Sequence, residues 1–217
     1  MSAPQLDWTE GRSQPRARPR RRFAWLVSAL QAAALTVVLT AGSYAAYCGI
    51  IIYEGNFNTV RQGVLYRSAQ PDKSELEAYA RKYGIRSVLN LRGAHPRDAW
   101  YESEMAGVHE LGLVHYDYPI SAKRFVTSRQ IAQILDIVRR APKPLLIHCQ
   151  SGADRAGLVA ALYDYAIAGE SAREADRQLS LIYGHFPYLT SKSGAMDASF
   201  WAYVHRDGHR DGHRPAQ

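Results

Sequence analysis

One short segment of this 217-residue chain combines residue types that can bind and attack a phosphate group. It reads His148-Cys149-Gln150-Ser151-Gly152-Ala153-Asp154-Arg155, with the cysteine and the arginine six positions apart. The apolar run 144–147 before it predicts a strand, and residues 156–162 after it predict a helix. A tight loop between strand and helix directs backbone N–H groups at one point, where the helix N-terminus and Arg155 favour an anion. The same field favours the thiolate of Cys149, which is the nucleophilic form of cysteine.

The residue types of this segment define a reaction. Gly152 allows the backbone to curl so that N–H groups point inward, and Arg155 can hold two phosphate oxygens at once. Attack by Cys149 on phosphorus would give a phosphocysteine that water then hydrolyses. An acid must protonate the departing oxygen, and aspartates at 154, 117 and 98 are the candidates.

The charge of the chain is concentrated at its N-terminus. Of the formal net charge of +7, residues 1–22 carry +4, from six arginines against Asp7 and Glu10. The remainder shows no basic stripe with interleaved aromatic residues, so we expect no nucleic-acid partner. Cys48 lies in an apolar run and Cys149 in the loop, and two such cysteines make no disulfide framework.

Residues 23–53 form an uncharged, apolar stretch. Its 31 residues exceed the roughly 20 that cross a bilayer core, which predicts one transmembrane anchor. The arginines at 16–22 place the N-terminus in the cytoplasm by the positive-inside rule, and residues 54–217 outside it. Two alternatives remain: a cleaved export signal that begins at the twin-arginine-like Arg20-Arg21-Arg22-Phe23, or a buried helix of a soluble domain.

Four regions are expected. Residues 1–22 form a disordered basic arm, 23–53 the anchor, 54–205 one folded domain, and 206–217 a disordered tail. Within the domain, the patterns predict strands at 63–68, 86–91, 113–119 and 145–148, and helices at 72–83, 98–111, 128–140, 155–168, 171–183 and 194–205. Alternating strands and helices predict an α/β fold with a mostly parallel central sheet flanked by helices.

The loop motif, preceded by Leu145-Leu146-Ile147, matches the His-Cys-x5-Arg signature of the protein tyrosine phosphatase superfamily. Two further motifs, Val64-Leu65-Tyr66-Arg67-Ser68-Ala69-Gln70-Pro71 and Val88-Leu89-Asn90-Leu91-Arg92, are typical of its bacterial dual-specificity branch. The resemblance covers about residues 57–205 and leaves out the anchor and both tails. It implies the cysteine-phosphatase fold, with Cys149 as nucleophile and Arg155 as the phosphate-binding residue.

The resemblance also implies supporting roles. His148 would orient the loop and support the thiolate, and residues 150–154 would bind phosphate through their backbone. Asp154 resembles the loop aspartate that a subset of the superfamily is proposed to use as general acid, and is our first choice. Asp117 is the second choice, because other dual-specificity enzymes carry their acid on a separate loop near that position.

Several positions are open or unusual. Arg67 and Arg92 could each contact phosphate or make a structural ion pair, and His185 could border the cleft or belong to the core. Most relatives carry Ser or Thr after the arginine, where the hydroxyl stabilises the departing thiolate. Ala156 lacks that hydroxyl, which predicts slow hydrolysis of the phosphocysteine.

We therefore expect a membrane-anchored cysteine phosphatase that acts on phosphotyrosine or other phosphomonoesters and needs no metal or other cofactor. The loop has no lysine between Cys149 and Arg155, which favours phosphoprotein or aryl phosphate substrates over inositides. The alternatives are a catalytically weak phosphate-binding module at the membrane, a phosphoinositide phosphatase and a sulfurtransferase. The sequence does not define an oligomeric state.

Overall fold

The computed structural model describes residues 20–210, and contacts divide the chain into two compact units with their boundary after Ala45. Helix α1 (Arg20–Tyr53) has 34 residues. Its segment Trp25–Tyr53 is long and apolar enough to cross a membrane, and none of its most apolar window is buried within the protein. Residues 1–19 of the expected basic arm lie outside the described residues.

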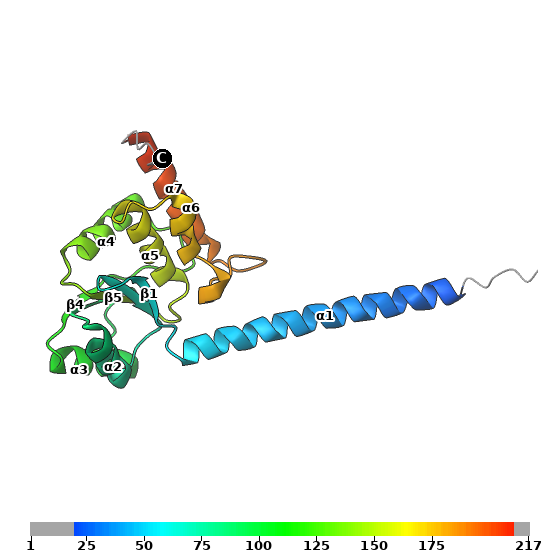
Figure 1. Ribbon diagram of the computed structural model, residues 1–217, viewed down its shortest axis with the longest axis horizontal. Coiled ribbons are helices and arrows are strands. Elements are labelled where there is room, and N and C mark those ends of the chain that lie inside the picture. The colour runs from blue at the N-terminus through cyan, green and yellow to red at the C-terminus, as the bar shows by residue number, and fades with distance from the viewer. Residues whose placement is uncertain (1–19, 211–217) are drawn as a thin grey trace, which may run out of the picture. The chain divides into compact units, whose positions relative to one another are not determined.

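Five strands form one sheet (Figure 1). In chain order they are β1 (Asn58–Arg61), β2 (Leu65–Ser68), β3 (Ser87–Asn90), β4 (Val114–Asp117) and β5 (Leu145–His148). Across the sheet the order is β1-β2-β5-β3-β4, with β1 antiparallel to β2 and all other neighbours parallel. β5 is therefore central, and its carboxyl end lies at the edge where parallel sheets bind ligands.

Helices cover both faces of this sheet (Figure 1). They are α2 (Lys73–Tyr83), α3 (Ala99–Glu110), α4 (Ser128–Arg140), α5 (Asp154–Ala166), α6 (Ala172–Ala175) and α7 (Gly194–Arg210). Because side chains alternate along a strand, Leu146 shares one buried cluster with Leu76 of α2 and Val108 of α3. Leu145 and Ile147 belong to the second cluster, with residues of α4, α5 and α7. The predicted α/β fold with a mostly parallel sheet is confirmed.

Local side chains begin and end the helices as their sequences indicate. Asp72 accepts the N–H of Glu75, and the Glu75 carboxylate accepts the N–H of Asp72, which makes a capping box at α2. Thr127 and Gln130 make the same box at α4. Gly84 ends α2 in the left-handed conformation, with φ of 69°.

One predicted helix is wrong. Over 171–183 the chain instead forms α6, then 3₁₀ turns at Asp176–Gln178 and Leu181–Tyr183. The carbonyl of Gln178 accepts Nη1 of Arg67 at 2.7 Å, and the next residue, Leu179, leaves helical geometry with ψ of 69°. A distant side chain thus takes the carbonyl that a continuous helix would use.

Two further differences lie at the edges of the domain. The edge strand β1 was not expected, because its four residues are at most half-buried and alternate with exposed positions. α7 continues to Arg210, past residue 205, where we expected the folded domain to end. Residues 211–217 of the expected tail lie outside the described residues.

Candidate active site

Residues 149–153 form a loop that joins β5 to α5. Cys149 directly follows the central strand and is 1% exposed. α5 has 13 residues and begins at Asp154, so its N-terminal end adjoins the loop. The positive end of a helix stabilises a bound anion and a cysteine thiolate alike.

Arg67 of β2 lies behind this loop. It is fully buried, and its Nη2 donates to the carbonyls of Gly152 at 2.7 Å and Ala153 at 3.0 Å. Nη1 donates to Gln178, and the guanidinium lies 4.3 Å from the ring centroid of Tyr183. Burial lowers the pKa of Arg67 to about 10, which still leaves it charged at neutral pH. Of the two roles considered for Arg67, this geometry favours the structural one, through carbonyls rather than through an ion pair.

The two preceding carbonyls of the loop are also bonded from outside. That of Gln150 accepts the N–H of Gln70 at 3.3 Å, and that of Ser151 accepts Nδ2 of Asn56 at 2.8 Å. A trans peptide holds a carbonyl and the next N–H on opposite sides. Since the carbonyls from 150 to 153 are bonded from outside, the N–H groups that follow them face the opposite side, towards the interior of the loop. One of them, that of Ala153, also makes a long hydrogen bond to Oγ of Ser151 at 3.4 Å. Such a set of N–H groups is an anion site.

Gly152 gives the loop its shape. Its φ is +73°, and a Cβ there would lie 2.7 Å from the backbone nitrogen of Ala69 and from the carbonyl carbon of Ser68. Any other residue would be strained and would push the loop away from β2. The glycine predicted to turn the loop is therefore required by both conformation and space.

One nitrogen of the Arg155 guanidinium has no hydrogen-bond partner among residues 20–210. Its Nη1 makes long hydrogen bonds to the carbonyls of Leu91 at 3.3 Å and Ile120 at 3.4 Å. Its Nε is buried and has no partner among residues 20–210. A buried guanidinium donor without a partner is costly, and a phosphate oxygen would satisfy it.

His148 packs behind the loop against Glu104 of α3, a residue that the sequence did not single out. Both side chains are fully buried, and Nε2 of His148 lies 2.9 Å from Oε1 of Glu104. His115 of β4 lies 2.9 Å from the same oxygen, and Gln70 donates to Oε2 at 2.8 Å. Burial raises the pKa of Glu104, but the charge of His148 and three hydrogen bonds outweigh it and lower that pKa far below its usual range. Glu104 is therefore ionised, and it supports the loop through its hydrogen bond to His148.

Asp154, our first choice as acid, is tied to His185. Its Oδ1 lies 2.7 Å from Nδ1 of His185, and Nε2 of His185 lies 2.9 Å from Oδ2 of Asp197. His185 is fully buried rather than at the rim of a cleft. Burial lowers the pKa of His185, but its hydrogen bonds to the two carboxylates raise it overall to about 9. Asp197, like Glu104, is a partner that only the fold reveals.

Asp117 and Asp98 are engaged elsewhere. Both oxygens of Asp117 accept hydrogen bonds, from Nδ2 of Asn90 at 2.8 Å and from the hydroxyl of Tyr101 at 2.6 Å. Asp98 accepts Nε1 of Trp100 at 3.0 Å and lies beside His95 on the surface. These contacts favour a structural role for Asp117 and for Asp98.

Arg92 lies close to the charged groups of the loop. Its guanidinium carbon is 3.4 Å from the ring centroid of Trp100, and its Nη1 donates to Gln70 at 3.0 Å. Burial lowers the pKa of Arg92, the charge of Arg155 lowers it further, and that of Cys149 opposes the shift. Both arginines considered for the pocket thus lie within electrostatic reach of Cys149.

Ala156 is fully buried in the first turn of α5, directly after Arg155. Its methyl group belongs to the core, so no hydroxyl is available at this position. Among residues 20–210, no group of three or more His, Cys, Asp or Glu side chains is arranged to hold a metal ion.

Comparison with known proteins assigns the family. Residues 52–173 match the model of the tyrosine phosphatase family, and the chain belongs to that family. It is thus a cysteine-based phosphatase, as the loop indicated, and the predicted superfamily is confirmed. No curated protein is similar enough in sequence to count as a relative.

Solved structures share the fold. TpbA of P. aeruginosa is 22% identical, with 70% of this chain and 92% of that one covered and a TM-score of 0.51. A cysteine-to-serine variant of TpbA has been crystallised with pTyr, and it matches with the same identity and TM-score. The core catalytic domain of the PP-IP phosphatase Siw14 of S. cerevisiae, in complex with citrate, is 19% identical, with 75% and 96% covered and a TM-score of 0.53.

Proposed function

We propose that this chain hydrolyses phosphomonoesters through a phosphocysteine on Cys149 and acts at a membrane to which α1 anchors it. One observation carries the proposal. The loop after β5 combines four outward-bonded carbonyls with the unused, buried Nε of Arg155, next to a buried cysteine. A tetrahedral oxyanion supplies the acceptors that this arrangement lacks.

The first step transfers phosphorus to sulfur. The Cys149 thiolate forms an S–P bond while the P–O bond to the leaving group breaks. Loop N–H groups and Arg155 hold the phosphoryl oxygens, and Asp154 gives its proton to the departing oxygen. Asp154 can pass on a proton from the His185 imidazolium, whose Nδ1 lies 2.7 Å from its Oδ1, while its other oxygen faces the leaving group.

The second step restores the enzyme. Water attacks phosphorus, the S–P bond breaks, and Asp154, now a carboxylate, takes a proton from the water. The thiolate leaves without a hydroxyl at position 156 to stabilise it, because that residue is alanine. We therefore propose that this step limits turnover.

For the substrate we favour phosphotyrosine or another aryl phosphate. The absence of lysine between Cys149 and Arg155 leaves no loop side chain for a second phosphate group. The TpbA variant crystallised with pTyr supports an aryl phosphate, whereas Siw14 is a PP-IP phosphatase and represents the inositide alternative. Competition between the two substrate classes distinguishes them.

We also propose that Trp25–Tyr53 crosses the membrane, with the phosphatase domain outside the cytoplasm. The length and composition of the helix support a span, and the arginines at 16–22 support the orientation by the positive-inside rule.

Acid quenching tests the phosphocysteine. Full-length protein mixed with an aryl phosphate labelled in its phosphoryl group should retain label on the denatured chain, and Cys149→Ser should retain none. Cys48→Ser is the matched control, because Cys48 is the other cysteine of the chain, and it should retain label like the wild type. Label on Cys149→Ser, or its loss from Cys48→Ser, would contradict the assignment.

A further inference from the structure

The segment 181–189 exposes apolar side chains on both sides of a buried residue. Ile182 is 68% exposed, Tyr188 57% and Leu189 93%, while His185 between them is fully buried. Since His185 bonds to Asp154 and Asp197, the centre of the segment is fixed to the domain. The exposed residues therefore project from a segment whose centre is fixed by hydrogen bonds. Grouped apolar side chains that are exposed to solvent are typical of a contact surface.

Leu189 also has an unfavourable backbone. Its φ is +58°, in the left-handed region that non-glycine residues seldom adopt. With 93% of its surface exposed, this leucine gains almost nothing from packing within the domain. A strained turn that presents an apolar side chain to the outside indicates a partner beyond the domain.

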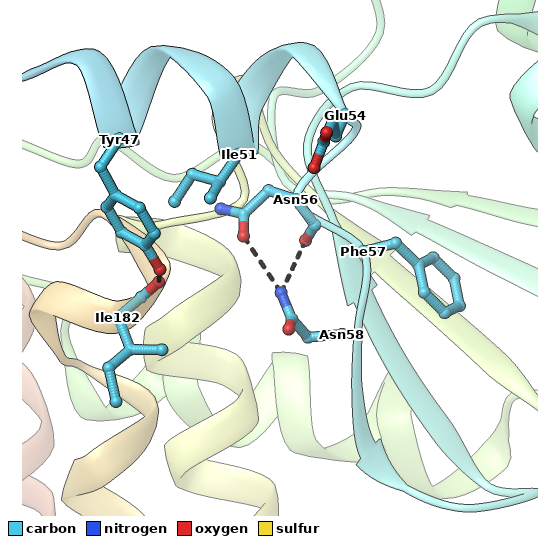
Figure 2. A pocket seen from close by; sticks show the side chains of 7 residues that line it. All are labelled: Tyr47, Ile51, Glu54, Asn56, Phe57, Asn58 and Ile182. Carbon is cyan, nitrogen blue, oxygen red and sulfur yellow. Dashed lines mark hydrogen bonds between the residues drawn. The ribbon is translucent and has the colours of Figure 1, made fainter.

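The same segment is bonded to the end of α1. The hydroxyl of Tyr47 donates to the carbonyl of Ile182 at 2.6 Å, and the two side chains lie beside one another in Figure 2, at a pocket of about 220 Å³. A Cβ on Gly184 would lie 3.5 Å from Ile51 and 3.7 Å from Cys48. All these residues belong to the same compact unit, so segment 181–189 packs on the last turns of α1.

These last turns would lie at the membrane surface. A hydrocarbon core about 30 Å thick takes up about 20 helical residues, so a core that begins near Trp25 ends near Tyr44. The helix runs on to Tyr53, and the residues after Tyr44 then pass through the interfacial layer, where tyrosine is favoured. Ile182, bonded to Tyr47, would lie in the same layer.

We propose that segment 181–189 is a membrane-contact loop whose apolar side chains enter the interfacial layer of the bilayer that α1 crosses. The occupant is lipid because Ile182 binds Tyr47 at the end of the helix that crosses the bilayer, where Ile50 is 57% and Tyr53 91% exposed. The inference rests on the proposed membrane anchor. It would seat the domain on the bilayer and hold the Asp154 partner His185 close to that surface.

Fluorescent probes in nanodiscs test the loop and the anchor separately. Full-length protein with Cys48→Ser and Cys149→Ser receives one new cysteine for an environment-sensitive dye. Leu189→Cys reports the loop, Leu39→Cys the anchor, and Phe125→Cys is the matched control, an apolar residue 49% exposed in another part of the domain. Ile182→Cys is a second loop probe.

We expect lipids with a spin label near the headgroup to quench the dyes at Leu189 and Ile182, and lipids labelled deep in the acyl chain to quench the dye at Leu39. The dye at Phe125 should keep its emission. An unquenched Leu39 probe would refute the anchor. A quenched Leu39 probe with loop probes quenched no more than Phe125 would refute the loop contact alone. Blue-shifted but unquenched loop probes would indicate a protein partner or a second copy, and would also overturn the proposal.

Discussion

Asp154 has one carboxylate oxygen bonded to His185, whereas both oxygens of Asp117 are bonded to Asn90 and Tyr101. A general acid needs a free oxygen for the leaving group and must be protonated, so it causes the fall of activity at alkaline pH. We therefore expect Asp154→Asn to remove that fall from the pH profile of kcat/KM and to lower kcat/KM for an alkyl phosphate by about 10²–10⁴-fold. An aryl phosphate with a good leaving group should be much less affected.

Asp117→Asn is the matched comparison for this experiment. It should keep the alkaline fall in the pH profile of kcat/KM, because the new amide oxygen would still accept the hydroxyl of Tyr101. If Asp117→Asn removes the fall and Asp154→Asn does not, the acid is assigned to the wrong aspartate.

His185 makes folding stability depend on pH. Its pKa is raised from 6.5 to about 9 in the folded protein, because its bonds to Asp154 and Asp197 outweigh burial. A raised folded-state pKa gives stability that is complete below about 6.5 and is lost as pH rises through about 9, by at most about 3 kcal/mol. Thermal midpoints measured across this window should fall, and His185→Gln should flatten the decline. The exposed control His95→Gln should leave it unchanged, and an equal decline in His185→Gln would refute the assignment.

Ala156 should produce burst kinetics. Without a hydroxyl to stabilise the departing thiolate, hydrolysis of the phosphocysteine is expected to be slower than its formation. Stopped-flow hydrolysis of an aryl phosphate should then release one equivalent of the aryl product before a slow steady state. Ala156→Ser should raise the steady rate about tenfold, a change of roughly 1.4 kcal/mol in the barrier.

The control for this variant is Ala160→Ser, one turn further along α5 and also fully buried. It adds the same hydroxyl to the same helix without approaching the first turn. A steady rate that rises equally in both variants, or in neither, would contradict the role given to position 156.

At this scale the sequence predicts the residues whose chemistry is local. Cys149, Gly152 and Arg155 share one short segment, and their spacing defines a strand, a loop and a helix end. Glu104 and Asp197 lie 44 residues before His148 and 12 after His185, on helices of their own. Their carboxylates act only because the fold brings them to buried histidines, so a pattern of neighbours could not identify them.

At the scale of elements, β2 shapes the phosphate loop through Arg67. Lysine there would keep the charge but could not reach the carbonyls of Gly152, Ala153 and Gln178 together. We expect Arg67→Lys to lower kcat/KM about 10²-fold, the loss of roughly 3 kcal/mol of buried charged hydrogen bonds. Steady-state kinetics and a thermal midpoint measured on the same protein separate a misplaced loop from an unfolded one.

Arg61→Lys serves as the control, since Arg61 lies in the neighbouring strand with its side chain 55% exposed. It should match the wild type in both measurements. A folded Arg67→Lys protein with unchanged kcat/KM would refute the claim that Arg67 shapes the loop.

The contacts of Arg67 also explain why the helix predicted over 171–183 does not form. Hydrophobic patterns predict the parallel strands and most helices, because those signals lie within each segment. The break in 171–183 depends on a bond between residues 111 positions apart, from Arg67 to Gln178. The edge strand β1 likewise exists only because β2 pairs with it.

At the scale of the whole molecule, the apolar helix is evident from composition, whereas the packing of its last turns on segment 181–189 is not. That contact is made by Tyr47 and Ile182, 135 residues apart, and neither residue belongs to a motif. The membrane orientation also stays a prediction, because it rests on the basic flank of the helix.

A pair of reporter fusions after Gln217 tests this orientation. A reporter enzyme that folds only outside the cytoplasm should be active, and a fluorescent protein that matures only inside should be dark. The reverse pattern would reject the proposed topology and put the phosphatase domain in the cytoplasm.

The central claim is that Cys149 is a phosphatase nucleophile, and the most direct test is hydrolysis of a chromogenic aryl phosphate in the presence of a metal chelator. Full-length wild type and Cys149→Ser are compared at equal concentration, with binding of a phosphate analogue measured on both. We predict turnover by the wild type and none by the variant, while both bind the analogue. A folded wild type that binds the analogue without turnover, or a variant that remains active, would contradict the account.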